Sequence, residues 1–202
     1  AATLGVVLAA FVGWALERFL FLPLRGRKAS SMVLLVASLG AFTALQAIIA
    51  IFFTSQFQTL SALAPNAGVV HIGEAVMTHI PLIILALSVL TLTGLLLTLK
   101  FTRFGRAVRA ISDDEEVAKI VGINTNRIVG WVFVIGSGIA GAAGILIGFD
   151  TGLEPTMGLA LLLKGVIAAI IGGVGSIPGA FLGAFLLGFA ENFGIWHISG
   201  EW

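Results

Sequence analysis

Cysteine is absent from this 202-residue chain, which excludes disulfide bonds and thiolate metal sites. Charge is scarce as well: Asp, Glu, Lys and Arg make up 10% of the residues, whereas a soluble globular domain has about a quarter. A net charge of +1 gives no overall field that would attract nucleic acid or an acidic substrate. His71 and His79 are too far apart to form a metal site without further ligands, so we expect neither a metal nor a cofactor in this chain.

Two sequence signals are also missing. No cleavable signal peptide is recognisable, because the chain opens inside the apolar run AATLGVVLAAFVGWAL. No Lys follows the glycines in the G-x-x-x-x-G-K-[ST] pattern of a phosphate-binding loop, so we expect no ATPase activity and no other enzymatic function. The abrupt apolar start, and an end at SGEW without a closing basic segment, lead us to expect a fragment that lacks N-terminal and C-terminal spans.

Hydrophobic residues make up 58% of the chain, more than a soluble domain of this size can hide from water. A helix needs about 20 apolar residues to cross a bilayer. The sequence therefore predicts an all-α, polytopic transmembrane helical bundle, with a broken or re-entrant helix pair near the C-terminus. The expected spans are about 1–22, 29–53, 80–99, 128–149, 158–171 and 179–195.

The loops between these spans differ in charge. Arg and Lys are concentrated at 23–28 and at 100–127, whereas 54–79 and 150–157 contain neither. The positive-inside rule places the two basic loops in the cytoplasm. Whether 158–195 crosses fully or re-enters stays open, since both arrangements return the chain to the same side.

Segment 100–127 holds ten of the 21 charged residues. Arg103, Arg106 and Arg109 repeat every three residues, which indicates one side of a helix that runs on from the third span. Ser112 with Glu115 then has the form of a capping box, and acidic residues favour the first turn of a helix. Gly122 can end this short helix with a positive φ, and Asn124 or Asn126 can cap the next span. The residues of segment 100–127 that we expect to be functional are Arg106, Arg109, Ser112, Asp113, Asp114, Glu115, Glu116, Ala118 and Gly122.

This short amphipathic helix allows two interpretations. It either packs on the protein's own inner face as a solvated connector, or it docks a soluble partner.

Three runs of the sequence resemble the permease subunits of bacterial ABC importers for branched-chain amino acids. They are GRAVRAISDDEEVAKIVGINTNRIVGWVF, LLLKGVIAAIIGGVGSIPGAFLGAFLLGFAEN and ERFLFLPLRGRKASSMVLLVASLGAF. The resemblance covers most of the chain and is weakest at 54–79. Permeases of ABC importers dock their ATPase through an E-A-A-x-x-x-G motif. Glu116-Val-Ala-Lys-Ile-Val-Gly122 keeps its spacing, although Val117 replaces the first Ala and the later I-x-L-P is missing.

The resemblance implies a function and a set of partners. We expect a multi-pass subunit of the bacterial inner membrane that moves branched-chain amino acids by alternating access. A homologous or identical permease, two cytoplasmic ATPase subunits that bind ATP and Mg, and a periplasmic binding protein would complete the transporter. A related permease for urea, amides or a sugar, and a stand-alone channel or secondary transporter, are the alternatives.

Glycines mark two further candidate features. A helix break at Gly172, Gly173, Gly175, Ser176 and Gly179 is either a tight turn or part of the translocation pathway, where exposed backbone groups bind an amino acid. Small residues at every fourth position of the fourth span predict close helix packing, at Gly136, Ala140, Gly144 and Gly148.

Two polar residues lie within the apolar runs, and each has two interpretations. Lys164 is either functional within the membrane or extends to the membrane interface. Gln46 bonds another helix or lines the pathway.

Overall fold

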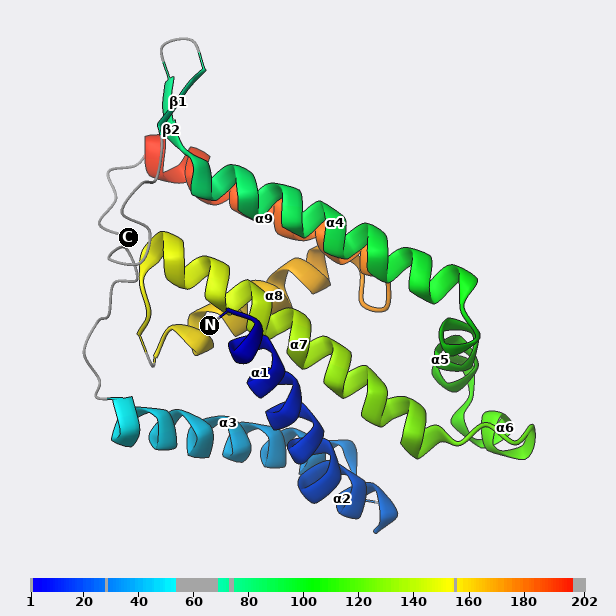
Figure 1. Cartoon of the computed structure of the whole chain (residues 1–202). Coiled ribbons are helices and arrows are strands. Elements are labelled where there is room, and N and C mark those ends of the chain that lie inside the picture. Colours follow the sequence, from blue (N-terminus) through cyan, green and yellow to red (C-terminus); the bar gives the residue numbers. More distant parts are fainter. Residues whose placement is uncertain (1, 28, 54–68, 73–74, 155, 198–202) are drawn as a thin grey trace. The chain divides into compact units, whose positions relative to one another are not determined.

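The computed structural model describes residues 2–27, 29–53, 69–72, 75–154 and 156–197 (Figure 1). The chain divides after Glu154 into two compact units, residues 1–154 and 155–202, and each is described by itself. Almost every described residue is helical, which confirms the all-α prediction.

The first unit begins with one long helical run of three parts. Helix α1 (Ala2–Leu16) continues through a π-helical turn, η1 (Glu17–Phe21), into α2 (Leu22–Gly26). Pro23 lies near the start of α2, just after the π-helical turn. The helix therefore extends past Leu22, where the sequence predicted the first span to end. Helix α3 (Ser31–Phe53) follows.

A small antiparallel hairpin, which the sequence analysis did not predict, precedes the next helix. Strands β1 (Val69–Ile72) and β2 (Ala75–Thr78) pair with Val69 opposite Thr78. The chain continues into α4 (His79–Phe101), α5 (Arg103–Asp113), α6 (Glu115–Ile120) and α7 (Thr125–Thr151). Helices α1 and α7 pack along one another, and α5 and α6 lie between the ends of α4 and α7 (Figure 1).

The second unit is a hairpin of two helices, α8 (Met157–Gly172) and α9 (Ile177–His197). Gly173 and Gly175 in the turn adopt backbone φ angles of 91° and 95°, which residues with a Cβ atom rarely adopt. The two helices approach closely beyond the turn. A Cβ at Gly172 would lie only 1.9 Å from the carbonyl oxygen of Gly179, so glycine is required at this contact. The sequence prediction of a broken helix pair here is confirmed, with α8 extended by one residue and α9 by two residues at each end relative to the expected spans.

The surface of the described residues is largely apolar. Large hydrophobic side chains are exposed along the helices, among them Leu90 at 68% and Phe189 at 67%, and among the described residues only Ala118 and Ala168 are buried hydrophobic side chains. Five helices are long and apolar enough to cross a membrane, and α8 is a shorter apolar helix. Because so much apolar surface is stable only in lipid or against other proteins, the chain is a multi-pass membrane protein.

Small residues bring α1 and α7 together. A Cβ at Gly13 would lie 2.0 Å from Oγ of Ser137, and a Cβ at Gly141 would lie 2.4 Å from Cβ of Ala9. Close backbone approach of this kind replaces the hydrophobic driving force that helices lack in lipid. The face of α7 that meets α1 is thus centred on Ser137, Gly138 and Gly141.

The predicted packing face of α7 is a different one. A Cβ at Gly136 or Gly144 would meet no atom within 4 Å in the described structure. Ala140 is exposed, and Gly148 is buried near the end of the helix. Close packing through Gly136, Ala140, Gly144 and Gly148 therefore stays a prediction, which would require a helix other than those that pack against this face of α7 in the described residues.

Replacing Gly13 by Val should separate α1 from α7, because Cβ of Ser137 would lie only 2.4 Å from the new Cβ and cannot rotate away. We expect the variant to lose about 1–3 kcal/mol of stability. The measurement is the midpoint of thermal unfolding in detergent. The matched control is Gly40→Val in α3, where a Cβ meets nothing within 4 Å. Equal midpoints for the two variants would contradict the packing described here.

Candidate functional site

The charged segment between α4 and α7 begins with a sharp turn at Thr102. This residue has extended backbone angles (φ −93°, ψ 159°), and its side chain accepts a hydrogen bond of 3.1 Å from the backbone N–H of Gly105. Thr102 is therefore the N-cap of α5. The prediction that the arginine helix runs on from the third span is wrong, because the threonine ends one helix and caps the next.

Helix α5 folds back against the end of α4. A Cβ at Gly105 would lie 2.0 Å from the carbonyl oxygen of Leu99, so only glycine permits this approach. The guanidinium of Arg109 donates a hydrogen bond to the same carbonyl oxygen, one of the α4 C-terminal groups that has no partner within its helix. The contact fixes the angle between the two helices.

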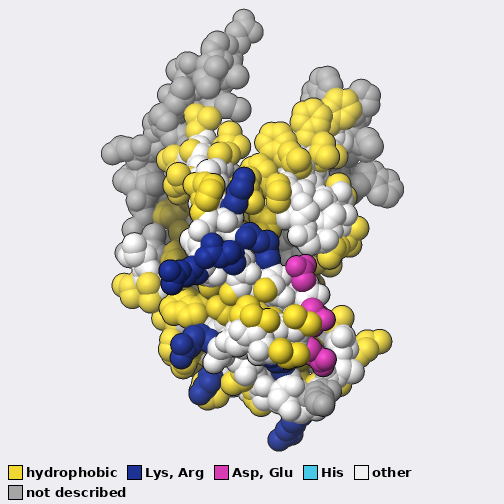
Figure 2. Space-filling view, turned by 90° about the vertical axis from the view of Figure 1, so that its right-hand side faces the viewer, with side chains coloured by type: hydrophobic (Ala, Val, Ile, Leu, Met, Phe, Trp, Pro, Cys, Tyr) yellow, Lys and Arg dark blue, Asp and Glu magenta, His cyan; other side chains and the backbone are white. Residues whose placement is uncertain are grey.

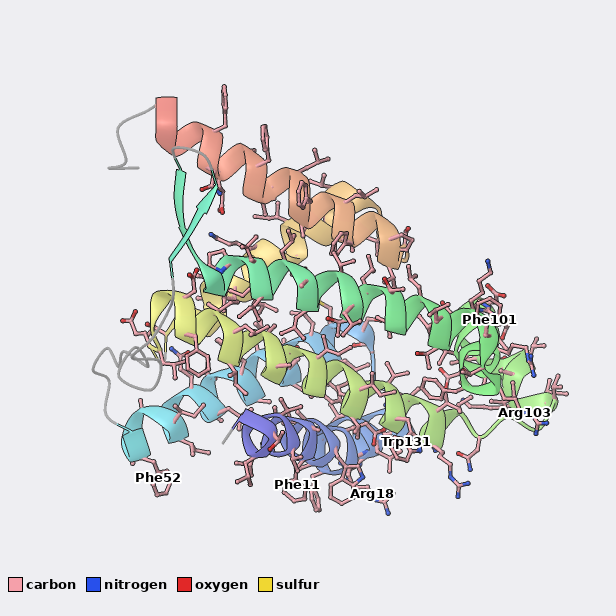
Figure 3. All side chains as sticks on the ribbon, turned by 45° about the horizontal axis from the view of Figure 1, so that its top comes forward. Phe11, Arg18, Phe52, Phe101, Arg103 and Trp131 are labelled. Atoms are coloured by element: carbon pink, nitrogen blue, oxygen red, sulfur yellow. The ribbon has the colours of Figure 1, made fainter. Side chains whose placement is uncertain are left out.

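The side chains of Arg103, Arg106 and Arg109 are all exposed on α5. Figure 2 looks onto the end of the molecule that carries α5 and α6, and there Lys and Arg side chains form a band with acidic side chains beside it. Arg103 is labelled at the start of α5 in Figure 3. The segment thus presents its positive and negative charges side by side on one exposed surface.

Helix α6 is capped by Asp114 and not by Ser112. The Asp114 carboxylate accepts hydrogen bonds from the backbone N–H groups of Glu116 at 2.8 Å and Val117 at 3.0 Å. Ser112 lies in the last turn of α5, so the predicted capping box with Glu115 is wrong. Both residue types favour N-caps, but the aspartate adds a negative charge at the positive end of the helix.

The other end of α6 follows the sequence prediction. Gly122 has a φ of 88°, and the N–H of Ile123 donates to the carbonyl oxygen of Ala118 at 3.0 Å, which closes the helix in a Schellman turn. Asn124 then caps α7, because its side chain accepts a 3.1 Å hydrogen bond from the N–H of Arg127. Both ends of the short helix are consequently fixed to the chain around it.

The exposed surface of α6 combines apolar and charged groups. Val117, Ile120 and Val121 are exposed by 53%, 83% and 74%, while Ala118 is 3% exposed and faces inward. Glu115 and Lys119 form a 2.8 Å ion pair along the solvent side. An apolar tip ringed by charges, and held by caps at both ends, has the surface chemistry of a small docking element for a protein partner.

A buried ion pair that the sequence analysis missed lies beside this segment. Glu17 in η1 is 4% exposed, and its Oε1 accepts a 3.1 Å hydrogen bond from Nη2 of Arg25. The carboxylate lies against α7, since a Cβ at Gly130 would be in van der Waals contact with Oε2 of Glu17, at 3.4 Å. The two residues are eight positions apart, so no helical spacing in the sequence indicates that they meet.

An open cavity of about 710 Å³ lies next to the buried pair. Trp14, Arg18 and Leu22 line one side, and Asn124 and Arg127 at the start of α7 line the other. Figure 3 labels Arg18 and Trp131, which also lines the cavity. The cavity joins the first helical run to the start of α7, and thereby to the end of the charged segment.

The glycine-rich break in the second unit is a tight turn. The N–H of Ser176 donates to the carbonyl oxygen of Gly173 at 3.1 Å, and the N–H of Gly179 donates to Oγ of Ser176 at 3.1 Å. Several backbone groups of the break are therefore already paired. A role of Gly172, Gly173, Gly175, Ser176 and Gly179 in translocation stays a prediction.

Two polar residues of the apolar helices have different surroundings. Lys164 of α8 forms a 2.9 Å ion pair with Glu191 of α9. Gln46 is partly buried in α3. The structure thus gives Lys164 a partner that neither of the two sequence interpretations named.

Comparison with known proteins decides the family. The family described as the permease component of branched-chain amino acid transport systems matches residues 1–201. The chain belongs to this family. The resemblance found in the three sequence runs is thereby confirmed, and the charged segment lies inside the region that matches.

Individual relatives of this chain support the same family. The chain is 33% identical over 201 residues to the high-affinity branched-chain amino acid transport permease LivH of Escherichia coli, covering 98% of this chain and 65% of LivH. It is 35% identical over 193 residues to BraD of Pseudomonas aeruginosa, covering 94% of this chain and 62% of BraD. It is also 33% identical over 120 residues to the xylose transport permease XylH of Escherichia coli, covering 56% of this chain and 30% of XylH. No solved structure matches the chain.

Replacing Asp114 by Ala should loosen the start of α6, because two backbone N–H groups lose their acceptor. We expect a cost of about 1 kcal/mol. This corresponds to roughly fivefold faster hydrogen–deuterium exchange in the α6 peptide. Asp113→Ala removes the same charge from the last residue of α5 and is the matched control. Equal exchange in the two variants would show that Asp114 is not the cap.

Replacing Arg25 by Met should leave the buried Glu17 carboxylate without its partner. We expect a loss of about 3 kcal/mol, seen as a lower midpoint of thermal unfolding. The double variant Glu17→Gln with Arg25→Met should recover most of this loss, because no buried charge then remains. A double variant as unstable as Arg25→Met alone would contradict the ion pair.

Proposed function

We propose that this permease forms the membrane-spanning pathway of an ABC importer for branched-chain amino acids, driven by ATPase subunits that bind the segment between α4 and α7. The support is the family match together with the doubly capped helix α6. A solitary channel has no need for a short helix that is fixed at both ends and exposes an apolar tip. The protein itself would act as a transport subunit and not as an enzyme.

The geometry of the charged segment suggests how force is transmitted. ATP and Mg bind to the two partner ATPase subunits, whose closure would displace α6. Movement at the N-terminal end of α6 passes through Asp114 to α5, and α5 is fixed to α4 by the close contact of Gly105 with Leu99. Movement at the other end passes through Asn124 to α7. A push on one short helix would thus reach two spanning helices and drive alternating access.

The remaining partners follow from this assignment. A second permease, identical or homologous, would complete the pathway, and a periplasmic binding protein would deliver leucine, isoleucine or valine. The bilayer would be the bacterial inner membrane, with α5 and α6 on the cytoplasmic side, as the Lys and Arg distribution predicts. The names of LivH and BraD support this substrate class.

A sugar importer is the second candidate, because XylH matches 56% of the chain at a comparable identity. The two candidates differ in one assay. Proteoliposomes that contain the assembled transporter and its binding protein should take up labelled leucine when ATP is supplied, and should not take up labelled xylose. Uptake of xylose and not of leucine would show that the transporter is a sugar importer.

Replacing Gly122 by Val should weaken binding of the ATPase subunits. The φ of 88° disfavours a β-branched residue, whereas the space around the glycine is open, so the effect acts through the backbone of α6. We expect less ATPase to co-purify and lower ATP-driven uptake. Gly122→Asn should retain more of both, because asparagine tolerates a positive φ better.

The control for this experiment is Gly26→Val at the end of α2. A Cβ there meets no atom within 4 Å, and Gly26 does not have a positive φ. Undiminished co-purification and uptake in Gly122→Val, relative to this control, would show that α6 does not dock the ATPase.

A further inference from the structure

The ion pair of Lys164 and Glu191 lies on the helical hairpin of the second unit. Nζ of Lys164 is 2.9 Å from Oε2 of Glu191, and the pair connects α8 with α9. Lys164 is near the middle of α8, about 10 Å from either helix end at 1.5 Å per residue. Close backbone contacts at Gly172, Gly179 and Gly183 also hold α8 against α9, so the ion pair is not the sole contact between these helices.

The surroundings of the pair are apolar. Leu161 and Ile167, three residues to either side of Lys164, share its side of α8, and Ile167 is 45% exposed. The side chains of the pair are themselves exposed by 53% for Lys164 and 41% for Glu191. A half-exposed ion pair facing hydrocarbon would be costly, so charged residues inside spanning segments face protein or a water-filled path.

The pair also has unused bonding capacity. Among the described residues, Oε2 of Glu191 is the hydrogen-bond acceptor of Lys164, whose ammonium can donate three hydrogen bonds. The Glu191 carboxylate can accept further bonds beyond this one. Space lies beside Glu191, because a Cβ at Gly188, three residues before it on α9, would meet no atom within 4 Å.

We propose that Lys164 and Glu191 bind the two charged ends of an amino acid as it crosses the membrane. This inference rests on the proposed function, and it names the groups that recognise the substrate. Lys164 donates to the α-carboxylate, Glu191 accepts from the α-ammonium, and the two side chains need not separate. A neutral sugar offers neither charge.

The apolar residues around the pair match the rest of the substrate. Leu161 and Ile167 lie three residues to either side of Lys164, and Leu187 lies four residues before Glu191. Residues at these spacings are neighbours on a helix surface. A branched aliphatic side chain can lie against them while its charged ends are held by the pair, which fits the substrates of branched-chain amino acid permeases.

Thiol labelling tests whether water and substrate reach the pair, and the absence of native cysteine makes the chain ready for it. Gly188→Cys places a thiol three residues before Glu191, where a Cβ has open space. In the assembled transporter, a charged, water-soluble thiol reagent should label this cysteine, and leucine delivered by the binding protein should slow the labelling on the order of tenfold. Xylose should not slow it.

Phe189→Cys is the control, because its side chain lies on nearly the opposite side of α9 from Glu191. Leucine should not change its labelling. The inference is overturned if Gly188→Cys stays unlabelled, or if leucine leaves its labelling rate unchanged.

Charge variants separate recognition from a structural role. Lys164→Met and Glu191→Gln should each lower leucine uptake by about tenfold or more. The exchange Lys164→Glu with Glu191→Lys keeps an ion pair but reverses the two ends, so the branched side chain would point away from Leu161 and Ile167. We expect this double variant to assemble and not to transport. Full recovery of transport would assign the pair a structural role and overturn the inference.

Failure of this inference differs from failure of the proposed function. If wild-type vesicles take up leucine with ATP and Lys164→Met does so equally well, the pair does not recognise the substrate and the importer assignment stands. If wild-type vesicles take up no leucine, the importer assignment itself fails. If a charge variant does not assemble, the labelling of Gly188→Cys decides.

Discussion

Backbone N–H groups at the start of a helix have no partner within it, and in this permease three short polar side chains supply the acceptors between α4 and α7. Thr102, Asp114 and Asn124 cap α5, α6 and α7 in turn. Each cap fixes the direction in which the next helix leaves. A loop of the same length without these caps could not transmit a displacement to the spanning helices. The proposed transmission of movement from α6 to α4 and α7 therefore depends on them.

The spanning helices depend on a different contact, the close approach of backbones through small residues. Gly13 and Gly141 bring α1 against α7, and Gly172, Gly179 and Gly183 bring α8 against α9. In lipid this packing replaces the expulsion of water that joins helices in soluble proteins. It also leaves the larger apolar side chains free to face lipid or a second permease. Two ion pairs join charges of the apolar helices, Glu17 with Arg25 and Lys164 with Glu191.

The sequence predicted the helices well because long apolar runs interrupted by charge leave few alternatives. Gly122 and Asn124 were also recognisable, since each residue type suits one terminal position. The turn at Thr102 was not, because the arginine repeat continues a helical spacing across it, and Gly105, which lets α5 fold back against α4, lies inside that repeat. The cap of α6 was misplaced by two residues, since Ser112 and Asp114 are both good caps and only the tertiary position of α5 decides between them. The pairing of Glu17 with Arg25 was not predictable, because a separation of eight residues is not a spacing that indicates neighbouring side chains on a helix.

We propose that a partner ATPase binds and displaces α6. The most direct test places a single cysteine at Ile120, which is 83% exposed at the apolar tip of the helix. In inside-out vesicles, a membrane-impermeant thiol reagent should label this cysteine rapidly in the permease alone and slowly once the ATPase subunits are bound. Labelling at the same rate with and without the ATPase, or labelling only from the opposite side of the membrane, would contradict the account.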